Sequence, residues 1–474
     1  PLAPLTSHGV RRLPPVTAGL PVGDGLLRRA VSPTSWSEVA QASSRRGAEL
    51  LPTSIAATPP NWIHDPLADR GELSLPALVE GVLAQNRSLQ ASIAAWRAAA
   101  ERYPQAVALD DPMFMGMIGP ASFNSDSVMP AYLVGGSQKL PWFGKRQLRG
   151  QKACFEARAA SFDVGDTRLQ LIQAARLAFY EYYLAQRQLE LNQTNLAAVR
   201  AFREAAVSRY EQGQVTQQDI LDSDVELAQL DRRQFELTAN RGVAIARINT
   251  LLHRAPDFPL PPSPKQLARL AELPPPELLR QLAISNRPDL AAIVSRLYAE
   301  QTAVDLANKD YYPDVELVAR YDAFWQEFPL RTMIGINANI PIYRKRLDSA
   351  TREAAFRASQ RRAEYEQRID DINRDVQSLY DKLRASQGLV ELYQRQTVPA
   401  AQQSVSAARA GYIAGKLDFL RLIESERRLI EIQDQQQDVL AGYHSLLAET
   451  ERVVAGPLPS PATPEELPLK VRVE

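Results

Sequence analysis

The stretch Leu140-Pro141-Trp142-Phe143-Gly144-Lys145-Arg146 returns two hundred residues later as Ile340-Pro341-Ile342-Tyr343-Arg344-Lys345-Arg346. Other landmarks return in the same order: Asn86-Arg87 as Asn286-Arg287, Tyr103-Pro104 as Tyr312-Pro313, and Tyr210-Glu-Gln-Gly213 as Tyr412-Ile-Ala-Gly415. Solenoid repeats have much shorter periods of about 20 to 50 residues. The sequence therefore predicts one large block of structure copied once, and a function that suits a pseudo-symmetric object.

The composition excludes several classes of protein. Lys+Arg and Asp+Glu each number 55 in the 474 residues, so the chain lacks the basic excess that attracts nucleic acid, and no nucleic-acid partner is predicted. The single cysteine, Cys154, excludes an intramolecular disulfide and a CxxC metal site, and we expect a small apolar filler there. No run of about 18 apolar residues exists, which excludes a membrane-spanning helix but not membrane strands of about ten residues.

Proline density divides the chain. Residues 1–70 are rich in proline and have little periodicity, so we predict a flexible leader, with any export signal removed or not included. The two copies are expected at residues 71–253 and 273–456, joined by a linker at 254–272. Residues 457–474 are predicted to be a flexible tail.

Very long helices are predicted in both copies. No proline occurs between Phe143 and Ala255, and a helix over 147–211 would reach about 100 Å at 1.5 Å per residue. Gly213 is the expected turn into a second helix, and Gly415 is its counterpart. Apolar residues at steps of three and four predict coiled-coil seams. In the second copy that seam is expected at Val376, Leu383, Val390, Ala400 and Ala407, with a kink at Pro399.

Before each long helix the spacing of apolar residues changes from that of a helix to that of a strand. Shorter leading helices are expected over about 74–102 and 275–310. Segments 314–322 and 331–340 alternate apolar and polar residues, which predicts two strands; the first copy has less regular counterparts at 113–118 and 131–140. Four strands cannot close a barrel, because even small barrels use about eight. Several chains must therefore pool their strands.

Two strands followed by a long helical hairpin, twice over, resemble the TolC-like outer membrane efflux proteins over residues 73–456. The motifs that carry this resemblance are Asn286-Arg287-Pro288-Asp289-Leu290, the Ser137–Pro141 strand end with Phe143–Arg146, and the two Tyr-x-x-Gly tips. The Trp142–Arg146 segment is most similar to the cation-efflux branch.

The resemblance implies a mainly α fold with a small β part, assembled as a homotrimer. Twelve pooled strands would form a β-barrel in outer membrane lipid, and twelve helices would form an α-barrel tunnel in the periplasm. The chain would be the passive exit duct of a tripartite pump for metal ions, drugs or other small molecules. Its partners would be a periplasmic adaptor protein and an inner-membrane pump, and no cofactor is expected. An apolar strand face could meet lipid, while a hydrated lumen suits Glu316, Arg320, Asn337 and Asn339.

The resemblance also implies a periplasmic gate near the second tip. In that family an acidic ring narrows the entrance, and the matching positions are Arg421 and Glu424, with Tyr412 one turn before the bend. Asp219 and Asp222 hold the corresponding first-copy positions. Arg421 departs from an acidic ring, so Arg421 and Glu424 have a second interpretation as a local i,i+3 salt bridge. Asp219 and Asp222 have a second interpretation as favourable charges at a helix N-terminus.

The tip glycines also have two interpretations. Gly213 and Gly415 permit a tight reversal of the chain. By resemblance, this end is where the adaptor docks. Both interpretations can hold together.

Met113, Met115 and Met117 share a face if their segment is a strand, and thioethers suit soft Cu(I). Methionines at a barrel rim are more often plain apolar side chains, so no metal site is predicted from the sequence.

No enzyme is predicted, because the four histidines are scattered and neither a P-loop nor a G-x-S-x-G elbow is present. The alternative class is a periplasmic coiled-coil adaptor or structural tether, which would not need two pairs of alternating strands.

Overall fold

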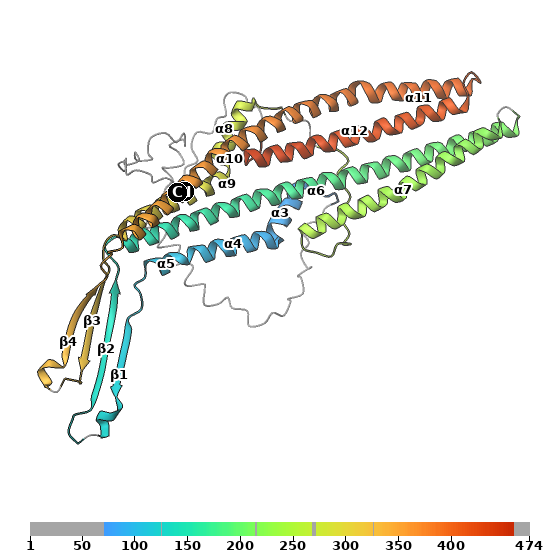
Figure 1. Cartoon of the computed structure of the whole chain (residues 1–474). Helices are drawn as coiled ribbons and strands as arrows, with labels where there is room; N and C mark the ends of the chain where they lie inside the picture. Colours follow the sequence, from blue (N-terminus) through green and yellow to red (C-terminus); the bar gives the residue numbers. More distant parts are fainter. Residues whose placement is uncertain (1–70, 125, 214–215, 268–271, 326, 459–474) are drawn as a thin grey trace, which may run out of the picture. The chain divides into compact units, whose positions relative to one another are not determined.

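The computed structural model describes residues 71–124, 126–213, 216–267, 272–325 and 327–458. These residues form long helices and one four-stranded sheet (Figure 1), which confirms the predicted mainly α fold with a small β part. The predicted leader 1–70 and residues 459–474 of the predicted tail lie outside this description. The elements are α3 (Leu75–Gln85), α4 (Arg87–Ala100), α5 (Arg102–Val107), β1 (Met113–Gly119), η2 (Pro120–Asn124), β2 (Ala131–Leu140), α6 (Lys145–Glu211), α7 (Gln217–Leu251), α8 (Pro276–Asn286), α9 (Pro288–Lys309), β3 (Val315–Asp322), η3 (Phe328–Leu330), β4 (Thr332–Ala338), α10 (Arg344–Leu392), η4 (Tyr393–Thr397), α11 (Val398–Ile413) and α12 (Phe419–Val454).

The duplicated order is visible in these elements. Leading helices, two strands and a long hairpin occur first as α3 to α7, with three leading helices, and again as α8 to α12, with two. Within the described ranges, none of the helices combines the length and the apolar character needed to cross a lipid bilayer.

The first long hairpin agrees closely with its prediction. Helix α6 runs unbroken for 67 residues, and the chain reverses at Gly213, whose φ is +71°. Gly415 has φ +68° at the second reversal. A left-handed backbone is strained for any residue with a Cβ, which explains the glycine in both Tyr-x-x-Gly motifs.

The second hairpin differs at Pro399. Instead of a simple kink, a π turn, η4, separates α10 from α11, with Pro399 in the first turn of α11. A proline ring clashes with the carbonyl four residues earlier, and the wider π turn accommodates this. The extra residue shifts the seam by one, so the buried positions are Ala401 and Ala408 rather than the predicted Ala400 and Ala407.

The single helix expected over 74–102 or 275–310 is broken into two in each copy, and the first copy adds the short helix α5. Asn86 is extended and its side chain accepts the Ser88 amide at 2.9 Å, so it ends α3 and caps α4. In the second copy Pro288 forces Arg287 out of the helical region. Asp289 then accepts hydrogen bonds from Arg287 at 2.7 Å and from Arg368 of α10 at 2.6 Å. The Asn-Arg-Pro-Asp motif is therefore a clasp between leading and long helices.

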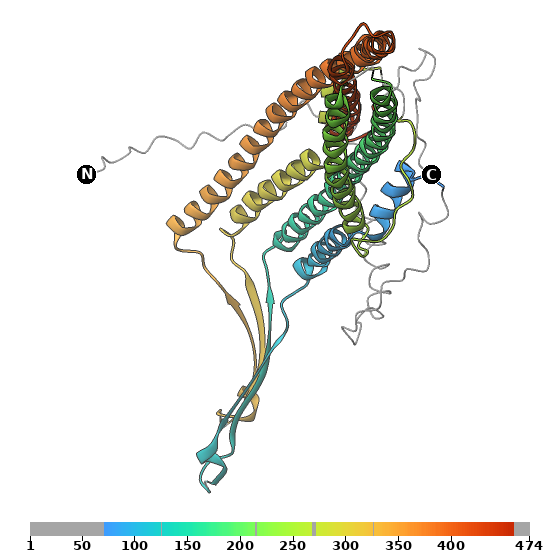
Figure 2. The ribbon, with the colours of Figure 1, turned by 90° about the vertical axis from the view of Figure 1, so that its right-hand side faces the viewer.

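The four strands form an antiparallel sheet in the order β1-β2-β3-β4 (Figure 1; turned by 90° in Figure 2). The pair β2–β3 joins the two copies, with Val134 opposite Tyr321 and Gly135 opposite Arg320. One face of the sheet exposes apolar side chains from all four strands, among them Phe114, Ile118, Val134, Leu317, Ile334 and Ile336. β4 ends at Ala338, two residues before the predicted strand end.

The repeated LPWFGKR stretch forms the junction between sheet and helices. Lys145, almost fully buried, places its ammonium 2.9 Å from Asp314 at the start of the second strand pair. The backbone amide of Trp142 donates to the same carboxylate at 2.8 Å, and its ring stacks on Tyr312 at 5.4 Å. A buried lysine requires a paired charge, so this contact fixes the first long helix to the second copy.

Candidate functional site at the hairpin tips

The two tips reverse by the same backbone device. The Gly213 amide donates to the Tyr210 carbonyl at 2.8 Å, and the Gly415 amide donates to the Tyr412 carbonyl at 3.0 Å. No Cβ contact would oppose a side chain at either glycine, so the positive φ alone explains the requirement for glycine.

Tyr412 lies in a small core rather than on the surface. Its side chain is 7% exposed and packs edge-on against Phe419 at 5.4 Å, beside Leu422 and Ile423. The guanidinium of Arg209, from the end of the first hairpin, sits 4.6 Å above the Tyr412 ring and donates to its carbonyl at 3.0 Å. Burial raises the pKa of the Tyr412 phenol, the charge of Asp219 adds to this, and Arg209 opposes it. The first hairpin therefore clamps the tip of the second.

Arg421 and Glu424 form an exposed pair. Their charged groups lie 3.5 Å apart at i and i+3 on α12, with side chains 73% and 51% exposed. This is the local salt bridge that was the second interpretation of these positions. Both residues are exposed on one turn of α12.

Asp219 and Asp222 lie in the first turns of α7. The Thr216 hydroxyl donates to Asp219 at 3.1 Å, and the Gln218 amide donates to Asp222 at 2.9 Å. These contacts fit the interpretation of N-terminal charges.

Sequence reasoning missed a set of ion pairs between the two hairpins. Glu226 of α7, whose side chain is 5% exposed, pairs with Arg427 of α12 at 2.5 Å, and Arg233 of α7 pairs with Asp434 of α12. Burial raises the pKa of Asp434, and Arg233 opposes that rise. The available signal was acidic residues at seam positions, since Glu226 precedes the buried Leu230 by four residues and Asp434 follows the buried Ile430 by four.

The face of the sheet opposite the apolar one carries most of the predicted lumen residues. Glu316 accepts hydrogen bonds from Ser137 at 2.5 Å and from Asn337 at 3.3 Å, while Arg320 lies against the Met333 sulfur at 3.7 Å. Glu316, Arg320 and Asn337 therefore share one face. Asn339 lies one residue beyond β4, where its side chain accepts the Asp314 amide at 2.5 Å.

The part of the chain that the structure describes contains no cluster of three or more His, Cys, Asp and Glu side chains able to hold a metal ion. Cys154 is partly buried, and burial raises the pKa of its thiol. A thiol that stays protonated is unreactive, which agrees with the predicted role as a small apolar side chain that fills space.

Comparison with known proteins shows which proteins this chain is similar to. The outer membrane efflux protein family matches residues 279–449. The cobalt-zinc-cadmium resistance protein CzcC of Cupriavidus metallidurans is 26% identical over 61% of this chain and 68% of its own length. The pyoverdine export outer membrane protein OpmQ of Pseudomonas putida is 26% identical over 62% of this chain and 63% of its own length.

Solved structures share the fold. The outer-membrane channel OprN aligns with a TM-score of 0.68 at 20% identity, covering 85% of this chain and 97% of its own. CusC aligns with a TM-score of 0.71 at 15% identity, covering 81% and 92%. The predicted resemblance to TolC-like outer membrane efflux proteins is thereby confirmed, and with it the outer-membrane localisation of the family. These relatives are efflux proteins rather than enzymes, as predicted.

Proposed function

We propose that three copies of this chain form the exit duct of a tripartite efflux system, which passively conducts metal ions, drugs or other small molecules from the periplasm to the exterior. The observation that carries the proposal is a sheet with two outer edges, β1 and β4, and an exposed apolar face. An open edge with an apolar face demands a partner, and strand pairing with another copy removes the edge.

The internal repeat supplies the geometry of that pairing. Matching Leu140 with Ile340 also matches Ser137 with Asn337. Since Ser137 pairs with Met113 and Asn337 pairs with Glu316, Met113 matches Glu316. The pair Val134–Tyr321, which joins the two copies in one chain, then corresponds to Ile334 opposite Ile118 of a neighbouring chain. Both isoleucines are exposed and lie on the apolar face, so this register keeps that face continuous.

The junction between sheet and helices supports the same assembly. In the same match Lys345 corresponds to Lys145, and Asp111 corresponds to Asp314. The buried Lys145–Asp314 pair would be repeated between chains by Lys345 and Asp111, both of which are exposed in the single chain.

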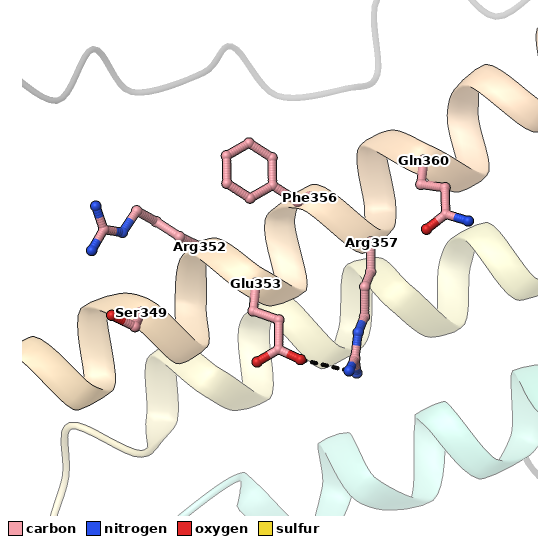
Figure 3. Close-up of a pocket in the computed structure, with 6 residues that line it drawn as sticks. All are labelled: Ser349, Arg352, Glu353, Phe356, Arg357 and Gln360. Carbon is pink, nitrogen blue, oxygen red and sulfur yellow. Dashed lines mark hydrogen bonds and ion pairs between the residues drawn. The ribbon is translucent and has the colours of Figure 1, made fainter. Parts of the chain in front are cut away.

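The leading helices also support contact between copies. Helix α9 has six buried residues and packs on α6, where Phe155 stacks on Tyr298 at 5.5 Å. Its counterpart α4 has none. The counterpart of α6 is α10, whose outward side carries a shallow hollow around the exposed Phe356, flanked by Arg352 and the Glu353–Arg357 ion pair (Figure 3). Helix α10 of one copy against α4 of the next would cover both surfaces.

Opening would occur at the tips. Outward movement of α11 and α12 would break the Arg209 clamp on Tyr412 and the ion pairs of Glu226 and Arg233 with α12. A periplasmic adaptor docking at the Gly213 and Gly415 tips, together with its inner-membrane pump, would supply the energy. Arg421 and Glu424 would then line the narrowest point, and Glu316, Arg320 and Asn337 would line the wet interior of the barrel.

The test is conductance of the detergent-purified full chain in a planar lipid bilayer. A duct is expected to give discrete channels and to purify as a trimer. An adaptor or tether would purify without detergent as a monomer or dimer and give no channels, which would overturn the proposal.

A further inference from the structure

The methionines of this chain have an unusual distribution. All five among the 474 residues, Met113, Met115, Met117, Met129 and Met333, fall in the two strand hairpins. Methionine is a good helix former and a common filler of irregular cores, yet the long helices contain none. Its role in this chain is therefore tied to the sheet.

Four of these methionines lie on the polar face: Met333 of β4, which is opposite Arg320, and three on β1. Strand pairing places Met113, Met115 and Met117 opposite Ser137, Gly135 and Leu133, on the same side as Glu316 and Arg320. Their exposed fractions are 69%, 42% and 54%. The apolar face is supplied instead by their neighbours Phe114 and Ile118. Contact with lipid hydrocarbon therefore does not explain the three thioethers.

Thioether chemistry does suggest a ligand. Side chains at alternate strand positions lie about 6.8 Å apart, so the flexible arms of adjacent methionines can bring two sulfurs to one ion. A thioether is a soft, neutral ligand that prefers Cu(I) or Ag(I) and binds Zn(II) or Mg(II) poorly. Neutral ligands do not retain the ion by charge, which suits contact during passage rather than storage.

We propose that Met113, Met115 and Met117 form a contact site for a soft monovalent metal ion, Cu(I) or Ag(I), on the lumen face of β1. Its role in transport rests on the proposed function, because only a duct gives this face access to cargo. The inferred register places Met117 opposite Gly335 of the next copy. In the single chain nothing beyond its own chain neighbours lies within 4 Å of where a Gly335 Cβ would be, so β4 itself presents no side chain that would block the thioether at this position.

The test measures Ag(I) binding to the detergent-purified full chain. All proteins carry Cys154→Ala, because a free thiol binds silver on its own. Competition titration and X-ray absorption compare this parent with Met113→Leu/Met115→Leu/Met117→Leu, which keeps apolar volume but removes the sulfurs. The matched control is Met129→Leu, in the connection between β1 and β2.

The triple variant is expected to lose about one silver ion per chain and its silver–sulfur signal, while Met129→Leu and Zn(II) binding stay unchanged. Equal silver binding by the parent and the triple variant, or an equal loss in Met129→Leu, would overturn the site. Conductance in sodium chloride without silver reports separately on the duct. Equal conductance of parent and triple variant shows an intact barrel, and a parent without channels refutes the duct while the silver result still stands.

Discussion

The two hairpin tips share the motif Tyr-x-x-Gly, but their tyrosines differ. Tyr210 of the first tip is 45% exposed, whereas Tyr412 of the second is 7% exposed beneath Arg209. The first hairpin thus holds the second within the chain. The repeated motif forms the same turn in both copies, but the packing around the turns differs. The first hairpin contributes Arg209, and the second hairpin is held by it.

The largest effect is expected from Arg427→Ala, which leaves the carboxylate of Glu226 buried without its partner. Removing one member of a half-buried pair costs about 2 kcal/mol. Thermal unfolding in detergent should therefore occur at lower temperature, and bilayer conductance should rise because the second hairpin is less restrained. The control is Arg428→Ala, the exposed neighbour. Equal unfolding temperature and conductance of the two variants would show that the Glu226–Arg427 ion pair does not restrain the second hairpin.

The leading segments also differ between copies, since the second has the Asp289 clasp. Burial raises the pKa of Asp289, but the hydrogen bonds and charges of Arg287 and Arg368 outweigh burial and lower the pKa to about 2. A depressed folded-state pKa stabilises the fold above the ordinary value of 3.8, and that stability is lost as pH falls from there toward 2.

Stability of the parent should consequently fall by about 2 kcal/mol over this acid window, measured by denaturant unfolding in detergent. Asp289→Asn should be less stable at neutral pH and should lose this part of the acid dependence. Asp305→Asn, an exposed position on the same helix, is the control. Parallel acid profiles of Asp289→Asn and the parent would contradict the clasp.

Arg209→Ala should release the second tip from the first hairpin, at a smaller cost in stability. A cation–π contact of this kind contributes about 1 kcal/mol. Amide hydrogen exchange should become faster at residues 411–416 and stay unchanged at the first tip. Arg200→Ala, further up the same helix, is expected to leave both tips unchanged. Unaltered exchange in Arg209→Ala would show that the clamp does not hold the second hairpin.

The smallest effect on stability belongs to Arg421→Ala and Glu424→Ala, because an exposed i,i+3 pair contributes a few tenths of a kcal/mol. Their effect should appear in single-channel conductance, which we expect to rise in both. Unchanged conductance in both variants would leave the surface salt bridge as the sufficient explanation.

Most of the fold was predictable because proline, glycine and periodicity act locally. The strands, the reversals at Gly213 and Gly415 and the seam at Leu383 and Val390 followed from such signals. The one-residue seam shift at Pro399 did not, because a kink and a π turn satisfy the same proline. The Glu226–Arg427 pair was missed because it depends on which helices meet, and that is decided by packing between distant segments.

The central claim is that copies of the chain close a barrel by pairing β4 of one copy with β1 of the next. Cysteine cross-linking tests this pairing most directly. Ile334→Cys with Ile118→Cys, in a Cys154→Ala background, places one thiol on each outer strand at the inferred register. Oxidation should give a covalent trimer on a denaturing gel. Ile334→Cys with Phe114→Cys, shifted along β1 by about 13 Å, should give little. A monomer band for the first pair, or equal cross-linking of both pairs, would contradict the assembly.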